Sequence, residues 1–190
     1  MIIYKDVFTD DEILSDIFQI KEVDEVFWEV DCKKYVKKKN QDFALEGANP
    51  SAEEGGDDYG GDDDEPGVMV HDIEESFLLN WLKPDDDGQE TKPSKDDFKA
   101  HLKKYVKNLS GHLKKTGASE EEVTKFQKAA LAGFKKLVAN YDNYDFMMGA
   151  SMNPDGIHCA TARYVLIDFR EDGITPYATI WKHGVTEMKV

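Results

Sequence analysis

Cysteine is scarce in this 190-residue chain, which has only Cys32 and Cys159. Neither lies in a CxxC pair or in a Cys/His spacing typical of zinc ligands. A disulfide framework or a structural zinc site is therefore excluded as the basis of the fold. Both thiols are predicted to be ordinary buried or half-buried side chains of a protein in a reducing, intracellular compartment.

Long apolar runs are also missing, so no segment is predicted to span a bilayer. Residues 1–6 lack the basic region and the long apolar stretch of a secretory signal. We therefore expect a cytoplasmic protein.

Basic residues are the minority charge. The chain has 24 Lys and Arg against 39 Asp and Glu, which gives a formal net charge of −15. Nucleic-acid binding requires an excess of cations to neutralise phosphates, so no nucleic-acid partner is expected. Apolar residues make up 40% of the chain and aromatic residues 11%, enough for the core of a single globular domain.

The few positive charges are concentrated in one segment. Residues 95–136 contain 11 Lys and 5 Asp or Glu, a net of +6, so the remaining residues carry −15 − 6 = −21. The sequence therefore places one basic element in a strongly acidic body.

Residues 95–140 are predicted to form a basic helical hairpin. Ser94 with Asp97, and Ser119 with Glu122, have the spacing of capping boxes at two helix starts, and Gly117 suits a left-handed helix end. Each helix has an apolar stripe at steps of three and four: Phe98, Leu102, Tyr105, Leu109 and Leu113, then Val123, Phe126, Ala130, Phe134, Leu137 and Tyr141. The short connection predicts antiparallel neighbours whose lysines face water.

The rest of the chain is predicted to be rich in β-strands. Residues 164–169 and 176–181 flank a turn at 171–173 and are expected to form a hairpin. Further strands are predicted at 1–8, 26–31, 35–39, 68–73, 77–82 and 144–148. The predicted fold class is therefore α+β.

An acidic segment interrupts this pattern. Residues 53–65 hold eight acidic residues, four glycines and no basic residue, so they cannot bury enough apolar surface to offset the entropy of ordering. We predict a mobile acidic loop over 41–67 and a second polar insert at 85–90. Asp62, Asp63 and Asp64 are candidate ligands for weakly bound calcium, although EF-hand spacing is absent. A solvated run of charges is the alternative.

Catalytic motifs are absent as well. The sequence has no GxSxG, HExxH, Walker A or GxGxxG, so neither an enzyme nor a required cofactor is predicted. His158 and Cys159 are neighbours whose side chains would point to opposite faces of a strand. His101 and His112 would lie about 16 Å apart on one helix, too far to share a metal, and are predicted to be solvated.

The outer face of the first helix is a candidate binding surface. We call it the lysine face, and it consists of Lys99, Lys103, Lys104, Lys107, Lys114 and Lys115. Electrostatic steering toward an acidic partner is one interpretation, and a solvated helix exterior is the other. Because the acidic body would repel DNA, a protein polymer with an acidic surface is the more reasonable partner.

Several longer strings, in order along the chain, resemble the translationally controlled tumour protein family. They are MIIYKD at residues 1–6, GANPSAE at 47–53, YDFMMG at 144–149, MNPDG at 152–156 and REDGITPY at 170–177. The resemblance implies a β-tent fold, in which small curved antiparallel sheets carry an inserted α-helical hairpin and a long flexible acidic loop.

The same resemblance implies a non-enzymatic cytosolic protein that acts in growth and survival. It implies calcium binding and, as partners, tubulin or microtubules, Bcl-2-family proteins and the small GTPase Rheb, with exchange-factor activity toward that GTPase. Tubulin contact is attributed to the helical region, which suits the lysine face. GTPase contact is attributed to the tent, where Glu12, Asn49 and Ser51 are the candidate residues.

Three departures from the family pattern alter these expectations. Ala150 stands where the second signature has Glu, so the GTPase surface is expected to be weakened or remodelled. Ala44 replaces a Ser that is phosphorylated in animal members. Many members end in Cys, whereas Val190 stands here, so the expected route to a disulfide dimer is missing and we expect a monomer.

Overall fold

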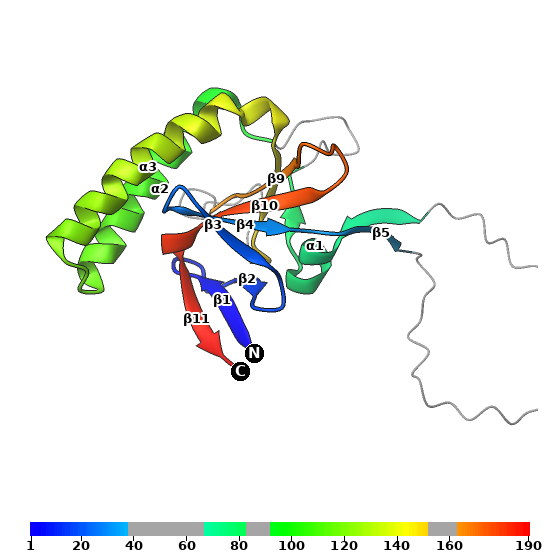
Figure 1. Ribbon diagram of the computed structural model, residues 1–190, viewed down its shortest axis with the longest axis horizontal. Helices are drawn as coiled ribbons and strands as arrows, with labels where there is room; N and C mark the ends of the chain where they lie inside the picture. The colour runs from blue at the N-terminus through cyan, green and yellow to red at the C-terminus, as the bar shows by residue number, and fades with distance from the viewer. Residues whose placement is uncertain (38–66, 83–91, 152–162) are drawn as a thin grey trace, which may run out of the picture.

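Antiparallel strands form most of the architecture (Figure 1). The structure is a computed structural model that describes residues 1–37, 67–82, 92–151 and 163–190, and all structural statements concern these residues. In chain order the strands are β1 (Ile2–Asp6), β2 (Glu12–Ser15), β3 (Ile20–Val23), β4 (Phe27–Asp31), β5 (Lys34–Lys37), β6 (Val68–His71), β7 (Asn80–Trp81), β8 (Asp145–Met148), β9 (Val165–Phe169), β10 (Pro176–Trp181) and β11 (Val185–Lys189).

The strands are arranged in three sheets, and the helices lie between and beside them. The strand orders are β11–β1–β2, β3–β4–β10–β9–β8–β7 and β5–β6. The helices are α1 (Asp72–Phe77), α2 (Lys95–Lys115) and α3 (Glu120–Ala139), with single 3₁₀ turns at Tyr141–Asn143 and Lys182–Gly184. In the described part of the chain, no helix combines the length and apolarity needed to cross a membrane.

Helices α2 and α3 confirm the predicted hairpin, and their starts can be compared with the predicted capping boxes. At α3 the box is complete, since Ser119 Oγ accepts from the Glu122 N–H (3.2 Å) and the Glu122 carboxylate accepts from the Ser119 N–H (2.7 Å). At α2 only Ser94 Oγ accepts from the Asp97 N–H (3.2 Å). The shorter Asp97 side chain accepts the Ser94 hydroxyl instead (2.6 Å). Gly117 lies just after the end of α2 and has the predicted left-handed conformation, with φ +88°.

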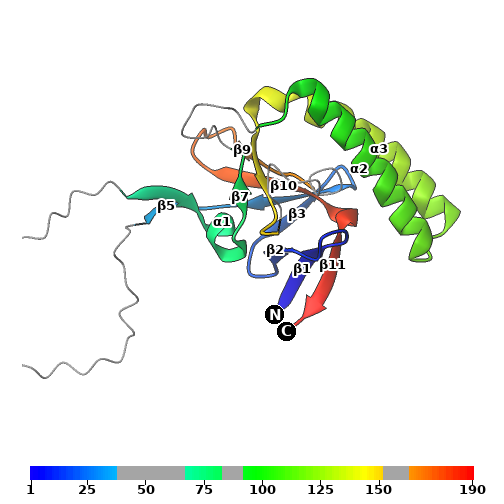
Figure 2. The same cartoon turned by 180° about the vertical axis from the view of Figure 1, so that it is seen from behind.

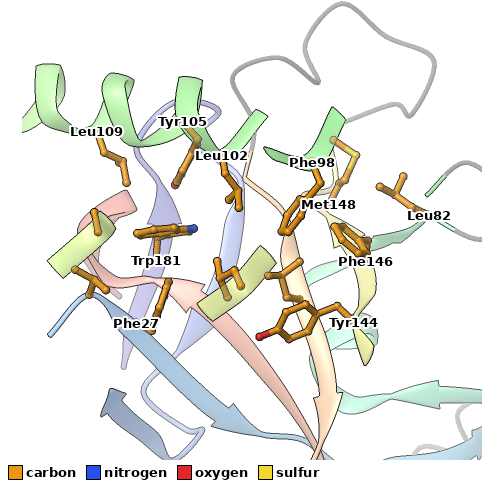
Figure 3. Close-up of a cluster of buried hydrophobic side chains, with 14 of the residues drawn as sticks. Phe27, Leu82, Phe98, Leu102, Tyr105, Leu109, Tyr144, Phe146, Met148 and Trp181 are labelled. Carbon is orange, nitrogen blue, oxygen red and sulfur yellow. The ribbon is translucent and has the colours of Figure 1, made fainter. Parts of the chain in front are cut away.

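Two hydrophobic cores lie on opposite faces of the six-stranded sheet. Strand alternation separates them: in β9, Leu166 belongs to the first core, whereas Val165 and Ile167 belong to the second. The hairpin covers the first core (Figure 3), whose members include Phe27, Phe98, Leu102, Tyr105, Leu109 and Trp181. The three-stranded sheet and α1 close the second through Tyr4, Ile13, Leu14, Ile73 and Phe77. The hairpin is thus anchored by its apolar stripes, which leaves its opposite face in water.

A buried ion pair joins Asp6 of β1 to Arg163, which lies just before β9. Arg163 Nε donates to Asp6 Oδ2 (2.5 Å), and both side chains are 1% exposed. The guanidinium also donates to the carbonyl oxygens of Trp181 (3.5 Å) and Gly184. The Tyr105 side chain of α2 also lies beside Gly184. A methyl group added at Gly184 would lie 2.2 Å from the Tyr105 hydroxyl oxygen. Burial raises the pKa of Tyr105 to about 12, so this hydroxyl stays protonated at neutral pH.

The strand predicted at 77–82 is shorter than expected, and the helix that precedes it was not predicted. Residues Asp72–Phe77 form α1, and only Asn80–Trp81 are extended. Ile73 and Phe77 are four residues apart, which is helical spacing, and both face the second core. Leu78 ends the helix in the left-handed region, with φ +52°.

Other strand predictions need smaller corrections. β1 ends at Asp6 rather than at residue 8, and β6 ends at His71 rather than at residue 73. The short strands β2, β3 and β11 were not predicted, because their exposed and buried positions do not alternate regularly. The hairpin of β9 and β10 is confirmed. The insert at 85–90 and the acidic loop over 41–67, apart from Gly67, lie outside the described residues.

Candidate functional site

The lysine face is formed on α2 by the packing of the opposite side of that helix. Phe98, Leu102 and Leu109 are fully buried or nearly so, which fixes the rotation of α2. The six predicted lysines fall on the remaining side. Lys99 is half-buried, whereas Lys103, Lys104, Lys107, Lys114 and Lys115 are exposed.

The lysines of α2 and α3 differ in their ion-pair partners. On α3, Lys125 pairs with Glu25 (3.4 Å) and Lys136 with Asp24 (2.8 Å), both acidic residues of the β3–β4 turn. On α2, Lys99 pairs with Asp96 of the same helix (3.3 Å). The five exposed lysines of the lysine face form no ion pair within the described chain. Ion pairs of α3 therefore attach the hairpin to the acidic body, whereas α2 presents lysines that have no ion-pair partner among the described residues.

Sequence analysis missed further exposed lysines on α3. Lys128 and Lys135 are exposed, and Leu131 between them is 59% exposed. Residues 128, 131 and 135 are three and four apart, so they share one face of the helix. The same spacing rule that identified the lysine face was sufficient to find them.

The two helix histidines are only partly exposed to solvent, which corrects the prediction. The His101 ring centroid lies 4.3 Å from that of Tyr164, and the His112 ring centroid lies 6.0 Å from that of Phe8. Both histidines are half-buried. Both histidines lie beside the apolar stripe of α2. The partly buried side of this helix is therefore wider than its apolar residues alone indicate.

Cys32 is buried, as predicted. Its Sγ lies 3.4 Å from the carbonyl oxygen of Val30, to which it donates. Burial, with a smaller contribution from the Asp72 carboxylate, raises the pKa of Cys32 to about 12. The thiol is therefore uncharged and poorly nucleophilic at neutral pH. Cys159 and His158 lie outside the described residues.

Glu12 lies at an exposed corner of the three-stranded sheet. It is the first residue of β2 and stands opposite Lys5 of β1, where the strand register shifts. The neighbouring Asp11 fixes this corner, since its carboxylate accepts from the Ser151 N–H (3.1 Å) and Ser151 hydroxyl (2.8 Å). The Thr9 hydroxyl donates to the same carboxylate (2.9 Å).

The corner leaves no room for a side chain at position 149. A methyl group on Gly149 would lie 2.4 Å from Asp11 Oδ2. The next residue, Ala150, is exposed, and its carbonyl oxygen accepts from Asn80 Nδ2 (3.4 Å). The segment that carries Ala150 is thus held against the loop that carries Glu12. The other predicted GTPase-site residues, Asn49 and Ser51, lie outside the described residues.

Metal binding was predicted for a segment that the structure does not describe. Asp62, Asp63 and Asp64 all fall in it. Within the described ranges, no group of three His, Cys, Asp or Glu side chains is arranged to hold a metal ion.

Comparisons with known proteins agree with this architecture. The family model for translationally controlled tumour protein matches residues 1–186. The homologue of that protein in Aspergillus fumigatus is 60% identical over 190 residues, and the Saccharomyces cerevisiae homologue is 41% identical over 191, each match covering both chains completely.

Solved structures give the same result. The tumour-associated protein p23fyp of Schizosaccharomyces pombe is 36% identical with a TM-score of 0.72, and both chains are covered completely. The translationally-controlled tumor protein of Caenorhabditis elegans is 32% identical with a TM-score of 0.65, and the match covers all of this chain and 99% of that one. The predicted α+β fold of small antiparallel sheets with a helical hairpin is therefore confirmed. On the full-length family match and these relatives, the chain belongs to the translationally controlled tumour protein family.

Proposed function

We propose that the chain is a non-enzymatic binding protein whose lysine face docks on the acidic surface of tubulin or microtubules. The observation that carries this proposal is the set of five exposed α2 lysines without an ion pair in the described chain. In a chain of net charge −15, such a surface gives a large electrostatic asymmetry, which orients the protein as it approaches an acidic polymer.

The expected strength follows from ordinary surface electrostatics. An exposed ion pair contributes about 0.5–1 kcal/mol when its geometry is good. Three such pairs then contribute about 1.5–3 kcal/mol, which corresponds to about 10-fold to 150-fold in affinity. At physiological ionic strength the screening length is about 8 Å, so binding should weaken as salt is added.

Microtubule co-sedimentation tests the proposal. Reversing Lys103, Lys104 and Lys107 to Glu should remove pelleting with microtubules at physiological salt. A matched control variant reverses three other exposed lysines, Lys21, Lys33 and Lys189, and so has the same change in net charge away from the hairpin. The control should pellet much more than the hairpin variant. Equal pelleting of the two variants would show that only net charge matters and would contradict the assignment.

A second proposal concerns the Glu12 corner, as a contact surface for a Rheb-like small GTPase. It is supported by the exposed carboxylate of Glu12 on a loop that Asp11 and Ser151 hold in place. The test measures GTPase affinity and nucleotide release for Glu12→Ala, with Glu187→Ala on β11 of the same sheet as the control. Loss of binding in the first variant alone is expected, and no difference between the two would refute the proposal.

The remaining functions are proposals that the family membership suggests. Weak calcium binding through Asp62, Asp63 and Asp64 is the alternative function. It is tested by amide-resolved NMR titration with calcium, with magnesium as control; equal small shifts for both ions would indicate screening only. Bcl-2-family partners and a cytoplasmic location are proposed on the same basis, and binding assays and localisation of the tagged protein test them.

A further inference from the structure

The ribbon of β5 and β6 carries several of the exposed apolar side chains of the described chain. It projects from the body at the end opposite the hairpin tip (Figures 1 and 2). Tyr35, Val36, Val68 and Met69 all lie on it and are exposed, Val36 at 52% and Met69 at 53%. Ten large apolar residues are exposed in the described chain, so these eight ribbon positions hold four of them. Val36 and Met69 are directly paired and share one face of the ribbon, whereas Tyr35 and Val68 lie on the other face. Exposed apolar side chains on both faces favour an interaction surface here.

A cleft of about 990 Å³ opens at the root of the ribbon. It is lined by the β2–β3 connection, the start of β5 and the β9–β10 turn. Ile17 and Ile174 stand on it and are strongly exposed, at 69% and 78%. Lys33, Lys34, Asp31 and Asp72 line it as well, so the cleft combines apolar walls with charges of both signs.

Hydrogen bonds and contacts of Lys33, Lys34 and Lys37 fix the position of β5 relative to α1 and β9. The Asp72 N–H donates to the Lys33 carbonyl oxygen (2.9 Å), and the Lys33 N–H donates to the Asp72 carboxylate (2.9 Å). Lys34 Nζ lies 4.3 Å from the ring centroid of Phe169. Lys37 pairs with Glu75 of α1 (2.5 Å), and their side chains are 56% and 35% exposed.

One edge of β5 has no strand partner among the described residues, and we call it the open edge. β5 pairs with β6 along its other edge, and Cys32, just before β5, still donates its N–H to the carbonyl oxygen of Pro176 (2.8 Å). Beyond Cys32 the described chain supplies no strand for that side. Lys33 and Lys34 also have no carboxylate partner in the described chain. Like-charged lysines on two such edges would repel each other, so a second copy of this chain is disfavoured and an acidic segment is favoured.

We propose that the open edge of β5 accepts an extended segment of a partner protein with the pattern acidic–apolar–apolar–acidic. In paired strands, residues directly opposite each other share a face and contact through their side chains. The β5 sequence Lys34–Lys37 is basic, aromatic, aliphatic and basic, so its complement has acidic ends and an apolar centre. This complement is the same in both directions and therefore suits parallel or antiparallel pairing. The surface includes neither the lysine face nor Glu12.

The test uses synthetic peptides and amide-resolved NMR of the full isotope-labelled chain. The probe is a capped peptide with Glu-Val-Val-Glu at its centre, and the controls have Lys-Val-Val-Lys or Glu-Ser-Ser-Glu. The expected result is saturable shifts of the amides of residues 33–37 with the probe only, together with slower hydrogen exchange along β5. Affinity should fall several-fold in Lys34→Glu and in Val36→Thr, both exposed positions where the fold is retained.

Two further comparisons make the result specific. Lys189→Glu has the same charge change on β11 and should leave the affinity for the probe unchanged. A peptide with Lys at the end opposite residue 34 should bind the Lys34→Glu variant better than the probe does. Shifts confined to α2, equal shifts with the Lys-Val-Val-Lys peptide, or no shifts would overturn the proposal. Concentration-dependent shifts of β5 without peptide would also overturn it, because they would show that a second copy covers the ribbon.

Discussion

The buried pair of Asp6 and Arg163 allows a quantitative test of the fold. Arg163→Met keeps a long apolar side chain but removes the positive charge. The Asp6 carboxylate is then left 1% exposed without its cation, and the Gly184 carbonyl loses a donor. Oδ1 of Asp6 retains the N–H groups of Phe8 (2.7 Å) and Thr9 (3.2 Å), so part of the compensation remains.

The expected loss follows from that geometry. Breaking a buried ion pair by removing one partner costs about 3–5 kcal/mol, and the two retained hydrogen bonds put the expected value near the lower end, about 3 kcal/mol. For a chain of this size the loss corresponds to about 6–12 °C in Tm. Lys5→Met is the control, because its pair with Asp10 (3.1 Å) is exposed on the Asp10 side at 80%, and such a pair contributes less than about 1 kcal/mol.

Urea unfolding followed by far-ultraviolet circular dichroism measures both variants. The midpoint should shift with an unchanged slope if stability alone is affected. Adding Asp6→Asn to Arg163→Met should restore at least about 1 kcal/mol, since the uncompensated charge is removed. A loss below 1 kcal/mol for Arg163→Met, equal to that of the Lys5→Met control, would refute the reasoning.

Three further predictions concern single side chains. Gly184→Ala should lower the urea midpoint, because its methyl group would overlap buried polar atoms at 2.2 and 2.3 Å. The control is Gly111→Ala in α2, where nothing lies within 4 Å of the added methyl group, so it should raise stability by about 0.5–1 kcal/mol. Equal effects of the two substitutions would contradict the close approach at Gly184. Burial, with a smaller effect of a neighbouring lysine, lowers the pKa of His183, so the unfolded chain binds a proton at higher pH than the folded chain. Stability should therefore fall as the pH drops below about 6.5, and His183→Gln should flatten that part of the pH profile; an unchanged profile would contradict this. In a Cys159→Ser variant, Cys32 should react with a thiol reagent only at the rate of chain opening, and rapid reaction in the native state would show that the thiol is accessible.

Local signals in the sequence were sufficient for the helical hairpin. Ser119 and Glu122 mark the start of α3, Gly117 ends the preceding turn, and the stripe from Phe98 to Leu109 sets the buried side of α2. These signals depend on neighbours within one or two helical turns, so the same signals give the direction of the lysine face. Prediction failed at α1, because no helix was predicted at residues 72–77 and the strands predicted at 68–73 and 77–82 overlapped its two ends. Only the spacing of Ile73 and Phe77 indicates this helix.

The sequence by itself therefore determined the α+β class, the charge asymmetry, the hairpin and the family resemblance, because each is encoded in adjacent or periodic residues. Only the tertiary structure decided which lysines form ion pairs, since Lys125 pairs with Glu25 and Lys136 with Asp24 of a turn far away in the sequence. It also decided the burial of Arg163 against Asp6, the support of the Glu12 corner by Ser151, and the exposure of the β5–β6 ribbon. Each of these depends on segments far apart in the chain that pack together through the two cores, and no local pattern records which distant segment a side chain will meet.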